Sequence, residues 1–237
     1  MVSSNDGEMR PPMVLRGAWA EGEREVLRRL IRAGTRFLDV GANVGYVSVF
    51  AGKVAPGVEI DSVEPHPDLV PLLRLNLWLN AVSARVWPLG LDSQRAVVPM
   101  SPQPVNRGAV EYERPRGGRS YSTIVPTARA DDLFRGQRFD VVKIDVHGWE
   151  WEVVLGMQDI ARGSPDLAIL VRFVPATIRE RGDDPADLLA RFRRMGFDLV
   201  IQYDGLLERR EDGEILDLCR SAGPTGQVNL VLLSSGR

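Results

Sequence analysis

Residues 37–50 of this 237-residue chain read FLDVGANVGYVSVF. A short apolar run ends at Asp39, and the segment Gly-Ala-Asn-Val-Gly leads into a second apolar run. Gly41 permits a tight turn that a side chain would block, and Gly45 allows close packing of the next helix on the strand. Asn43 stands where glycine is commoner, and asparagine tolerates left-handed backbone better than most residues. The stretch predicts a buried strand, a glycine-rich turn and a helix whose N-terminus faces a ligand.

A second acid follows in the segment SVEP, residues 62–65. Glu64 ends another predicted strand, where a carboxylate can accept hydrogen bonds from both hydroxyls of a ribose. Asp39 suits the cationic methionine end of S-adenosylmethionine and would lie poorly beside a pyrophosphate. These features indicate an adenosine-bearing ligand and favour S-adenosylmethionine over NAD. The alternative is that the glycines only shape a tight connection and that Glu64 is a solvated strand end.

Strand-like and helix-like segments alternate outward from this turn. The predicted elements are helix 19–33, strand 36–41, helix 44–55, strand 58–65, helix 67–81, strand 84–91, helix 129–135, strand 139–146, helix 150–157, strand 166–173, helix 185–195, strand 197–203 and strand 228–235. The alternation predicts an α/β fold with crossover units and a parallel sheet. The last strand has no helix directly before it, which predicts a late antiparallel hairpin in a seven-stranded sheet.

The chain divides into a short arm and one domain. Residues 1–17 are polar and contain Pro and Gly, so we expect a loose N-terminal arm, with a single domain over 18–237. Residues 99–127 are rich in Pro, Gly and Arg and lack helical periodicity, which predicts an insertion or lid over the mouth of the site. Tyr121 and Thr123 in this insertion are candidate contacts to an acceptor.

The composition excludes several classes of protein. Hydrophobic residues make up 44% of the chain, charged residues 26%, and the net charge is -2, so we expect no nucleic-acid or membrane partner. The single cysteine, Cys219, rules out an internal disulfide and favours the cytoplasm. The apolar face of the N-terminal helix leaves a homodimer open.

Residues 139–152 read FDVVKIDVHGWEWE, a buried type of strand that nevertheless carries charge. A lysine within a central strand must reach a carboxylate or a cleft, so Lys143 predicts a buried ion pair with Asp39 or another strand-end acid. Asp145 ends the strand, where ligands bind in open α/β sheets.

With these residues in hand, the chain resembles the FkbM-type S-adenosylmethionine-dependent methyltransferases. The segments FLDVGANVGYVSVFAG, VEPHPDLVPLLRLNLWLNA, FDVVKIDVHGWEWEVVLGM and LVRFVPATI carry the resemblance in the right order. It implies a Rossmann-like class I methyltransferase fold, a seven-stranded mostly parallel sheet with helices on both faces, and S-adenosylmethionine as cofactor, with S-adenosylhomocysteine (SAH) as product. It also implies O-methylation of a hydroxyl on a sugar or natural product.

The resemblance assigns cofactor contacts position by position. It implies that the methionine moiety lies against Asp39, Gly41, Asn43 and Gly45, the ribose against Glu64, the adenine along Gly90, Leu91 and Asp92, and the methyl group beside Asp145.

Two positions depart from the family pattern. His147 and Arg172 stand where the family usually carries acids, which disfavours a divalent metal, and we expect none. We expect His147 to be the general base, with Asp145 orienting cofactor or acceptor; a helix-entry residue that only bonds a loop is the alternative for His147. Arg172 is expected to pair with Asp145 or to hold an anionic group on a small-molecule acceptor. Trp149 is a candidate to stack a sugar.

Other functions stay open at this point. Glu150 is interpreted as a first-turn acid that favours the helix dipole, although it also lies within reach of the predicted site. The competing functions are N-methylation of an amino sugar or amine, an NAD(P)-dependent oxidoreductase, and a non-catalytic cofactor-binding protein.

Overall fold

The computed structural model describes residues 21–102, 110–112, 123–203 and 206–234. Up to the middle of the chain the elements are α2 (Glu21–Leu30), β1 (Arg36–Val40), α3 (Tyr46–Val54), β2 (Glu59–Val63), α4 (Leu69–Leu79), β3 (Arg85–Trp87), β4 (Gly90–Leu91), β5 (Ala96–Pro102), β6 (Val110–Tyr112) and β7 (Thr123–Ala128). They continue with α5 (Ala130–Leu133), β8 (Val141–Ile144), α6 (Glu150–Leu155), α7 (Gln158–Gly163), β9 (Ala168–Phe173), α8 (Pro175–Glu180), α9 (Pro185–Arg194), β10 (Phe197–Tyr203), β11 (Leu206–Arg209), α10 (Asp212–Ser221) and β12 (Val228–Ser234).

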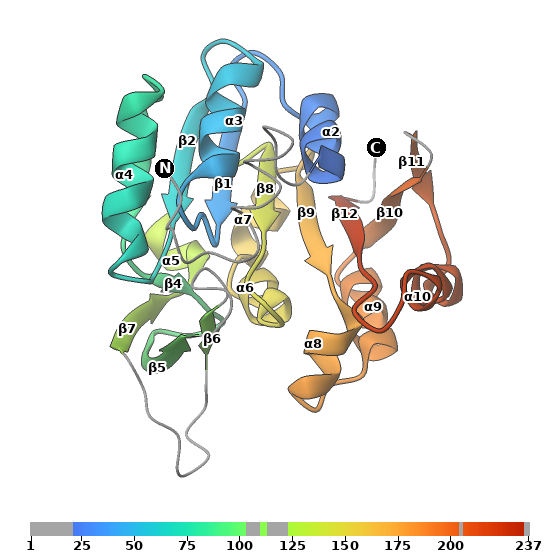
Figure 1. Cartoon of the computed structure of the whole chain (residues 1–237). Helices are drawn as coiled ribbons and strands as arrows, with labels where there is room; N and C mark the ends of the chain where they lie inside the picture. The colour runs from blue at the N-terminus through green and yellow to red at the C-terminus, as the bar shows by residue number, and fades with distance from the viewer. Residues whose placement is uncertain (1–20, 103–109, 113–122, 204–205, 235–237) are drawn as a thin grey trace.

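The core is a sheet with the strand order β11-β10-β12-β9-β8-β1-β2-β3 (Figure 1). β1 runs parallel to β2 and β8, β2 to β3, and β8 to β9. β12 lies antiparallel between β9 and β10. The predicted α/β class, mostly parallel sheet and late antiparallel strand are therefore confirmed.

Two details of the predicted sheet are wrong. The sheet has eight strands because β11 adds an antiparallel edge strand beside β10. Helix α10 also precedes β12, which was expected to have no helix before it. The pairing of β10 with β12 is nevertheless antiparallel, because β12 enters the sheet between β9 and β10 and runs opposite to both.

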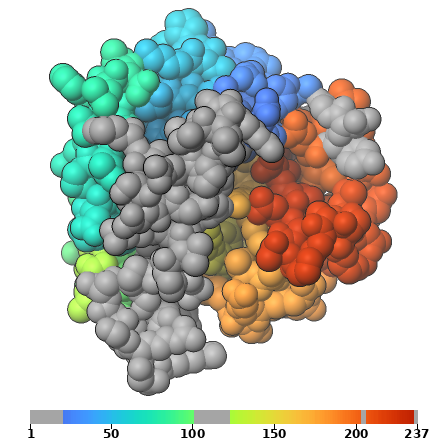
Figure 2. Space-filling view, in the orientation of Figure 1, coloured from blue at the N-terminus to red at the C-terminus, as the bar shows by residue number. Residues whose placement is uncertain are grey.

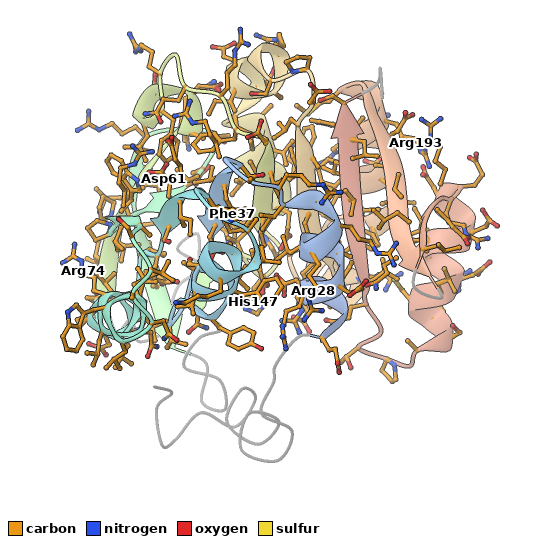
Figure 3. The ribbon with its side chains drawn as sticks, turned by 90° about the horizontal axis from the view of Figure 1, so that it is seen from above. Arg28, Phe37, Asp61, Arg74, His147 and Arg193 are labelled. Atoms are coloured by element: carbon orange, nitrogen blue, oxygen red, sulfur yellow. The ribbon has the colours of Figure 1, made fainter. Side chains whose placement is uncertain are left out.

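Alternating side chains give the sheet two apolar faces. Phe37 of β1 belongs to a buried cluster with Val26 of α2 and Val47 of α3. Leu38, the next residue, belongs to a second cluster that includes Val153 of α6. Figure 3 shows α2, α3 and α4 on one side of the sheet and α5 and α7 on the other. The face that carries Phe37 is called the α2 face below.

The described part of the 99–127 insertion is extended and joins β4 in a small second sheet. Its strand order is β4-β7-β5-β6, with β5 antiparallel to both β6 and β7. In Figure 1 this second sheet lies below the carboxyl ends of β1 and β2. Figure 2 shows α3 and α4 at one side of the molecule and the C-terminal elements at the other. Within the described residues, no helix is long and apolar enough to cross a membrane.

Candidate active site

The turn between β1 and α3 has the backbone that its sequence predicts. Gly41, Asn43 and Gly45 have φ angles of 77°, 53° and 84°, so Asn43 adopts the expected left-handed conformation. A Cβ atom on Gly41 would lie 2.2 Å from the backbone oxygen of Asp145. Gly41 is thus where the β1 and β8 loops touch.

Gly45 permits a different contact from the one expected. A Cβ atom there would lie 2.5 Å from Cδ1 of Leu73 in α4. The glycine therefore allows α4, rather than the strand, to approach the turn closely. The result is a rigid turn at the carboxyl edge of the sheet.

Glu64 closes one side of this turn. Its Oε2 accepts a hydrogen bond from the Asn43 N–H and its Oε1 one from the His66 N–H, each at 2.8 Å. Burial raises the pKa of Glu64 to about 7, although both N–H groups and Lys143 act to lower it. Each carboxylate oxygen keeps a second lone pair, so Glu64 can still accept a hydroxyl.

Lys143 connects the acids of β1 and β8. Its Nζ lies 3.4 Å from Asp39 Oδ1, 3.9 Å from Asp145 Oδ2 and 3.2 Å from the Gly41 carbonyl oxygen. The predicted ion pair with Asp39 is therefore present. Burial acts to lower the pKa of Lys143, but Asp39 and Asp145 outweigh it and raise the pKa above its ordinary value. Lys143 thus stays charged at neutral pH.

Asp145 lies between two cations. Arg172 Nη1 is 3.7 Å from Asp145 Oδ2, which confirms the expected pairing. Burial acts to raise the pKa of Asp145, but Lys143, Arg172 and His147 outweigh it and lower the pKa below its ordinary range. A carboxylate with a lowered pKa is a weak proton acceptor, so Asp145 is suited to orient charge and not to take a proton.

The turn after β8 presents His147 next to Asp145. His147 and Gly148 have φ angles of 49° and 95°, both in the left-handed region. The Gly148 N–H donates to Glu150 Oε1 at 3.0 Å, and Arg181 donates to the Gly148 carbonyl oxygen. Arg181 and Glu150 therefore hold this turn from both sides.

Glu150 lies in the first turn of α6, as the sequence predicts, but it is buried there. Its residue exposure is 4%, and burial raises its pKa to about 7, against the effect of the N–H groups it bonds. Its function in the structure is to brace the turn that carries His147.

Trp149 does not offer an open ring face to a sugar. It is 5% exposed, and the guanidinium carbon of Arg181 lies 4.0 Å from the centroid of its ring. Arg181 also pairs with Glu152 at 3.3 Å. The expectation of sugar stacking is therefore corrected: Trp149 is a buried support for Arg181.

The remaining predicted contacts lie toward the second sheet. Gly90 and Leu91 form β4, which pairs with β7, and Thr123 begins β7. The Asp92 N–H donates to the Ala128 carbonyl oxygen at 2.9 Å, and Asp92 Oδ1 accepts the Ser93 N–H at 2.6 Å. Tyr121 lies outside the described residues.

Glu23 is an acid of the site that the sequence did not reveal. It precedes Val26 and Leu27 by three and four residues in α2, so it shares their sheet-facing side. Burial raises the pKa of Glu23 to about 7; Asp145 and Asp39 add to this rise, and Lys143 and Arg172 oppose it. The signal that could have identified Glu23 is its position on the apolar face of the predicted helix, three and four residues before Val26 and Leu27.

The donor set at this edge fits a cationic, ribose-bearing ligand. Oδ1 of the fully buried Asp39 accepts no hydrogen bond from any described residue, although Lys143 is near. Glu64 supplies carboxylate oxygens for hydroxyls, and Gly41 leaves room at the turn. In the part of the chain that the structure describes, no group of three or more His, Cys, Asp or Glu side chains could hold a metal.

The fold and this edge together define a class I S-adenosylmethionine-dependent methyltransferase domain. The model of the FkbM methyltransferase domain matches residues 39–199, which include the turn, Glu64, Asp145 and Arg172. The chain belongs to the FkbM methyltransferase family, whose methyl donor is S-adenosylmethionine.

Curated relatives are similar at low identity. The methyltransferase sdnD of Sordaria araneosa is 28% identical over 155 residues, which are 52% of this chain and 60% of sdnD. The hexuronic acid methyltransferase AglP of Haloferax volcanii is 28% identical over 175 residues, 70% of this chain and 66% of AglP. The chain thus spans less than two thirds of either relative.

Solved structures share the fold. Precorrin-6y C5,15-methyltransferase from Geobacter metallireducens superposes with a TM-score of 0.50 at 13% identity, over 90% of this chain and 86% of the other. SMU.1697c from Streptococcus mutans, solved in complex with SAH, gives 0.50 at 7% identity, over 89% and 94% of the two chains. At these identities the likeness concerns the fold alone.

Proposed function

We propose that this protein transfers the methyl group of S-adenosylmethionine to a hydroxyl of a small-molecule acceptor, a sugar or natural product. The observation that supports this most is the meeting of Asp39, Glu64 and Asp145 at one edge of the sheet, around a glycine turn that belongs to an FkbM domain. Ligands bind at this edge in open α/β sheets.

Different residues of the site would bind different parts of the cofactor. S-adenosylmethionine supplies a methyl group on a positively charged sulfur. Asp39, with Gly41, Asn43 and Gly45, would hold the methionine end, and Glu64 the ribose. Gly90, Leu91 and Asp92 are proposed along the adenine. Because the donor is already activated, alignment of the acceptor provides much of the rate acceleration.

A hydroxyl acceptor also requires a base. The low pKa of Asp145 makes it a poor one, whereas an imidazole suits proton transfer near neutral pH. We assign that step to His147: its ring takes the hydroxyl proton as the acceptor oxygen bonds to the methyl group and the methyl–sulfur bond breaks, with SAH as the leaving group. Asp145 then stabilises the charged imidazole and orients it.

The acceptor class rests on the relatives and on Arg172. AglP is named as a hexuronic acid methyltransferase, and hexuronic acids carry a carboxylate beside their hydroxyls. Arg172 lies at the same edge and is partly exposed. Arg172 would bind an anionic group on such an acceptor. Thr123 and Tyr121 of the insertion are also proposed to contact the acceptor.

The test is incubation with methyl-labelled S-adenosylmethionine and a panel of glycosylated metabolites, hexuronic acids and amino sugars. We expect a one-methyl mass increase on a hydroxyl, with His147→Ala slowing transfer by about 10²–10⁴-fold and leaving SAH affinity unchanged. Methylation of amines alone would favour the N-methyltransferase. NAD(P) reduction without methyl transfer would favour an oxidoreductase, and SAH binding without any transfer a non-catalytic protein.

A further inference from the structure

We propose that Glu23 of α2 is a cofactor-binding residue whose carboxylate binds the α-ammonium group of the methyl donor. The inference rests on the proposed function, because it needs S-adenosylmethionine in the site. It adds a residue that lies outside residues 39–199, the part of the chain that matches the family model.

The contacts of α2 fix where Glu23 points. A methyl group added at Gly22 would lie 3.1 Å from Nδ2 of Asn229 in β12, and the guanidinium of Arg24 lies 5.0 Å from the centroid of the Phe50 ring in α3. Glu23 is between these two residues and one turn before Val26, which is fully buried against the sheet. Its side chain is therefore directed at the sheet, between β12 and α3.

The same face of the sheet carries the charged residues of the site. Asp39 follows Phe37 by two residues in β1, so both lie on the α2 face. Lys143 is in register with Asp39. Arg172 is in register with Asn229, the residue that packs next to Gly22. Glu23 thus approaches the cluster from the helix that covers it.

Among the described residues of this cluster, the acids outnumber the lysine and arginine side chains. Lys143 and Arg172 face Glu23, Asp39 and Asp145, and Glu64 lies in the electrostatic range of Asp39 and Lys143. No hydrogen bond or ion pair within the described residues holds the Glu23 carboxylate. A ligand with a cationic group would offset the excess of acids and bind the Glu23 carboxylate. The methyl donor carries such a group, the α-ammonium, on its amino-acid end. Asp39, with an oxygen that lacks a hydrogen bond, would bind the same group.

Two commercially available ligands separate this interaction from the rest of cofactor binding. SAH carries the α-ammonium, whereas 5′-methylthioadenosine keeps the adenine and ribose and lacks the whole amino-acid end. Calorimetric titration of the full chain with each ligand therefore isolates the contribution of that end. The matched control is Glu25→Gln in the same helix, because Glu25 pairs at the surface with Arg28 and Arg29.

We expect Glu23→Gln to weaken SAH binding about tenfold or more and to leave 5′-methylthioadenosine binding unchanged. Glu23→Asp, which keeps the charge with a shorter reach, should recover part of the SAH affinity. Glu25→Gln should change neither ligand. The far-ultraviolet circular dichroism spectrum checks that each variant is folded.

The pH dependence provides a second readout. Since the pKa of Glu23 is about 7, the ratio of SAH affinity to 5′-methylthioadenosine affinity should rise with pH between about 6 and 8 in the wild type and stay flat in Glu23→Gln. Glu64 titrates in the same range, but its effect cancels because both ligands carry the ribose.

If Glu23→Gln weakens the binding of both ligands equally, or does not weaken SAH binding, the proposed role of Glu23 is wrong and the proposed function still stands. A wild-type protein that binds neither ligand would overturn the proposed function together with it.

Discussion

At the scale of single residues, the site depends on charges that are buried together. Lys143 connects these charges, because its ammonium group contacts Asp39, Asp145 and the Gly41 carbonyl oxygen. Removing one member of a buried pair leaves the other charge uncompensated, and that costs more than the pair itself contributes.

Lys143→Met should therefore destabilise the protein by about 3–5 kcal/mol, measured by urea denaturation. Lys53→Met is the control, because Lys53, the other lysine of the chain, is exposed at the end of α3 and its loss should barely change stability. Equal stability of the two variants would contradict the structural role of Lys143.

Residue chemistry predicted part of this site from sequence. A lysine within a buried strand needs an acid, and an asparagine in a glycine turn indicates left-handed backbone; both inferences hold. Glu23 was not predicted as a site residue, because an acid in the first turn of a helix ordinarily faces solvent. Trp149 was misassigned because its partner, Arg181, comes from the end of α8, which no local pattern connects to it.

At the scale of elements, two turns form the site, and each depends on left-handed backbone. The turn after β1 uses Gly41, and the turn after β8 uses His147 and Gly148, braced by Glu150.

Gly41→Ala tests the first turn. The substitution combines left-handed strain with a contact to the Asp145 backbone oxygen, so we expect a loss of more than about 3 kcal/mol and a loss of SAH binding. Gly136→Ala has a similar φ of 73° but no atom within 4 Å of the added Cβ. It should cost about 1–2 kcal/mol and leave SAH binding intact. Comparable losses from the two substitutions would refute the close approach of the β1 and β8 loops.

Glu150→Gln tests the second turn through pH. The pKa of Glu150 is about 7 in the folded protein and ordinarily about 4.5, so between these values the folded state binds the extra proton. Wild-type stability should therefore fall as pH rises through this window, with up to about 3 kcal/mol from Glu150. Glu23 and Glu64 contribute in the same direction.

The Glu150→Gln variant keeps an oxygen for the Gly148 N–H and removes the titration. Urea denaturation at several pH values should show a smaller fall than in the wild type. Glu180→Gln, at an exposed position in α8, should keep the full wild-type fall. An unchanged pH dependence in Glu150→Gln would show that Glu150 does not bind the proton.

Element prediction succeeded where the pattern is local. Local patterns identified β1, β2, β8, β9, β10 and β12. The single strand expected over 84–91 is instead two strands, β3 and β4, which belong to different sheets. The six-residue helices α7 and α8 were not predicted, although α6, which is equally short, was. The second sheet depends on pairing between β4 and β7, which are distant in sequence, and so reads locally as an irregular segment.

At the scale of the whole molecule, the order of the strands brings the site together. β1 is central, between β2 and β8, so the residues that follow each of these strands meet at one edge. Helix α2 covers the same face of the sheet, and Lys143 and Asp145 both influence the pKa of Glu23 electrostatically. Membership of the FkbM family agrees with this arrangement.

Equilibrium titration of the purified protein with SAH, and with NAD and NADP in parallel, tests whether this edge of the sheet binds S-adenosylmethionine. We expect saturable binding of SAH at one site per chain and no saturable binding of either dinucleotide. Binding of NAD or NADP with none of SAH would refute S-adenosylmethionine as the ligand.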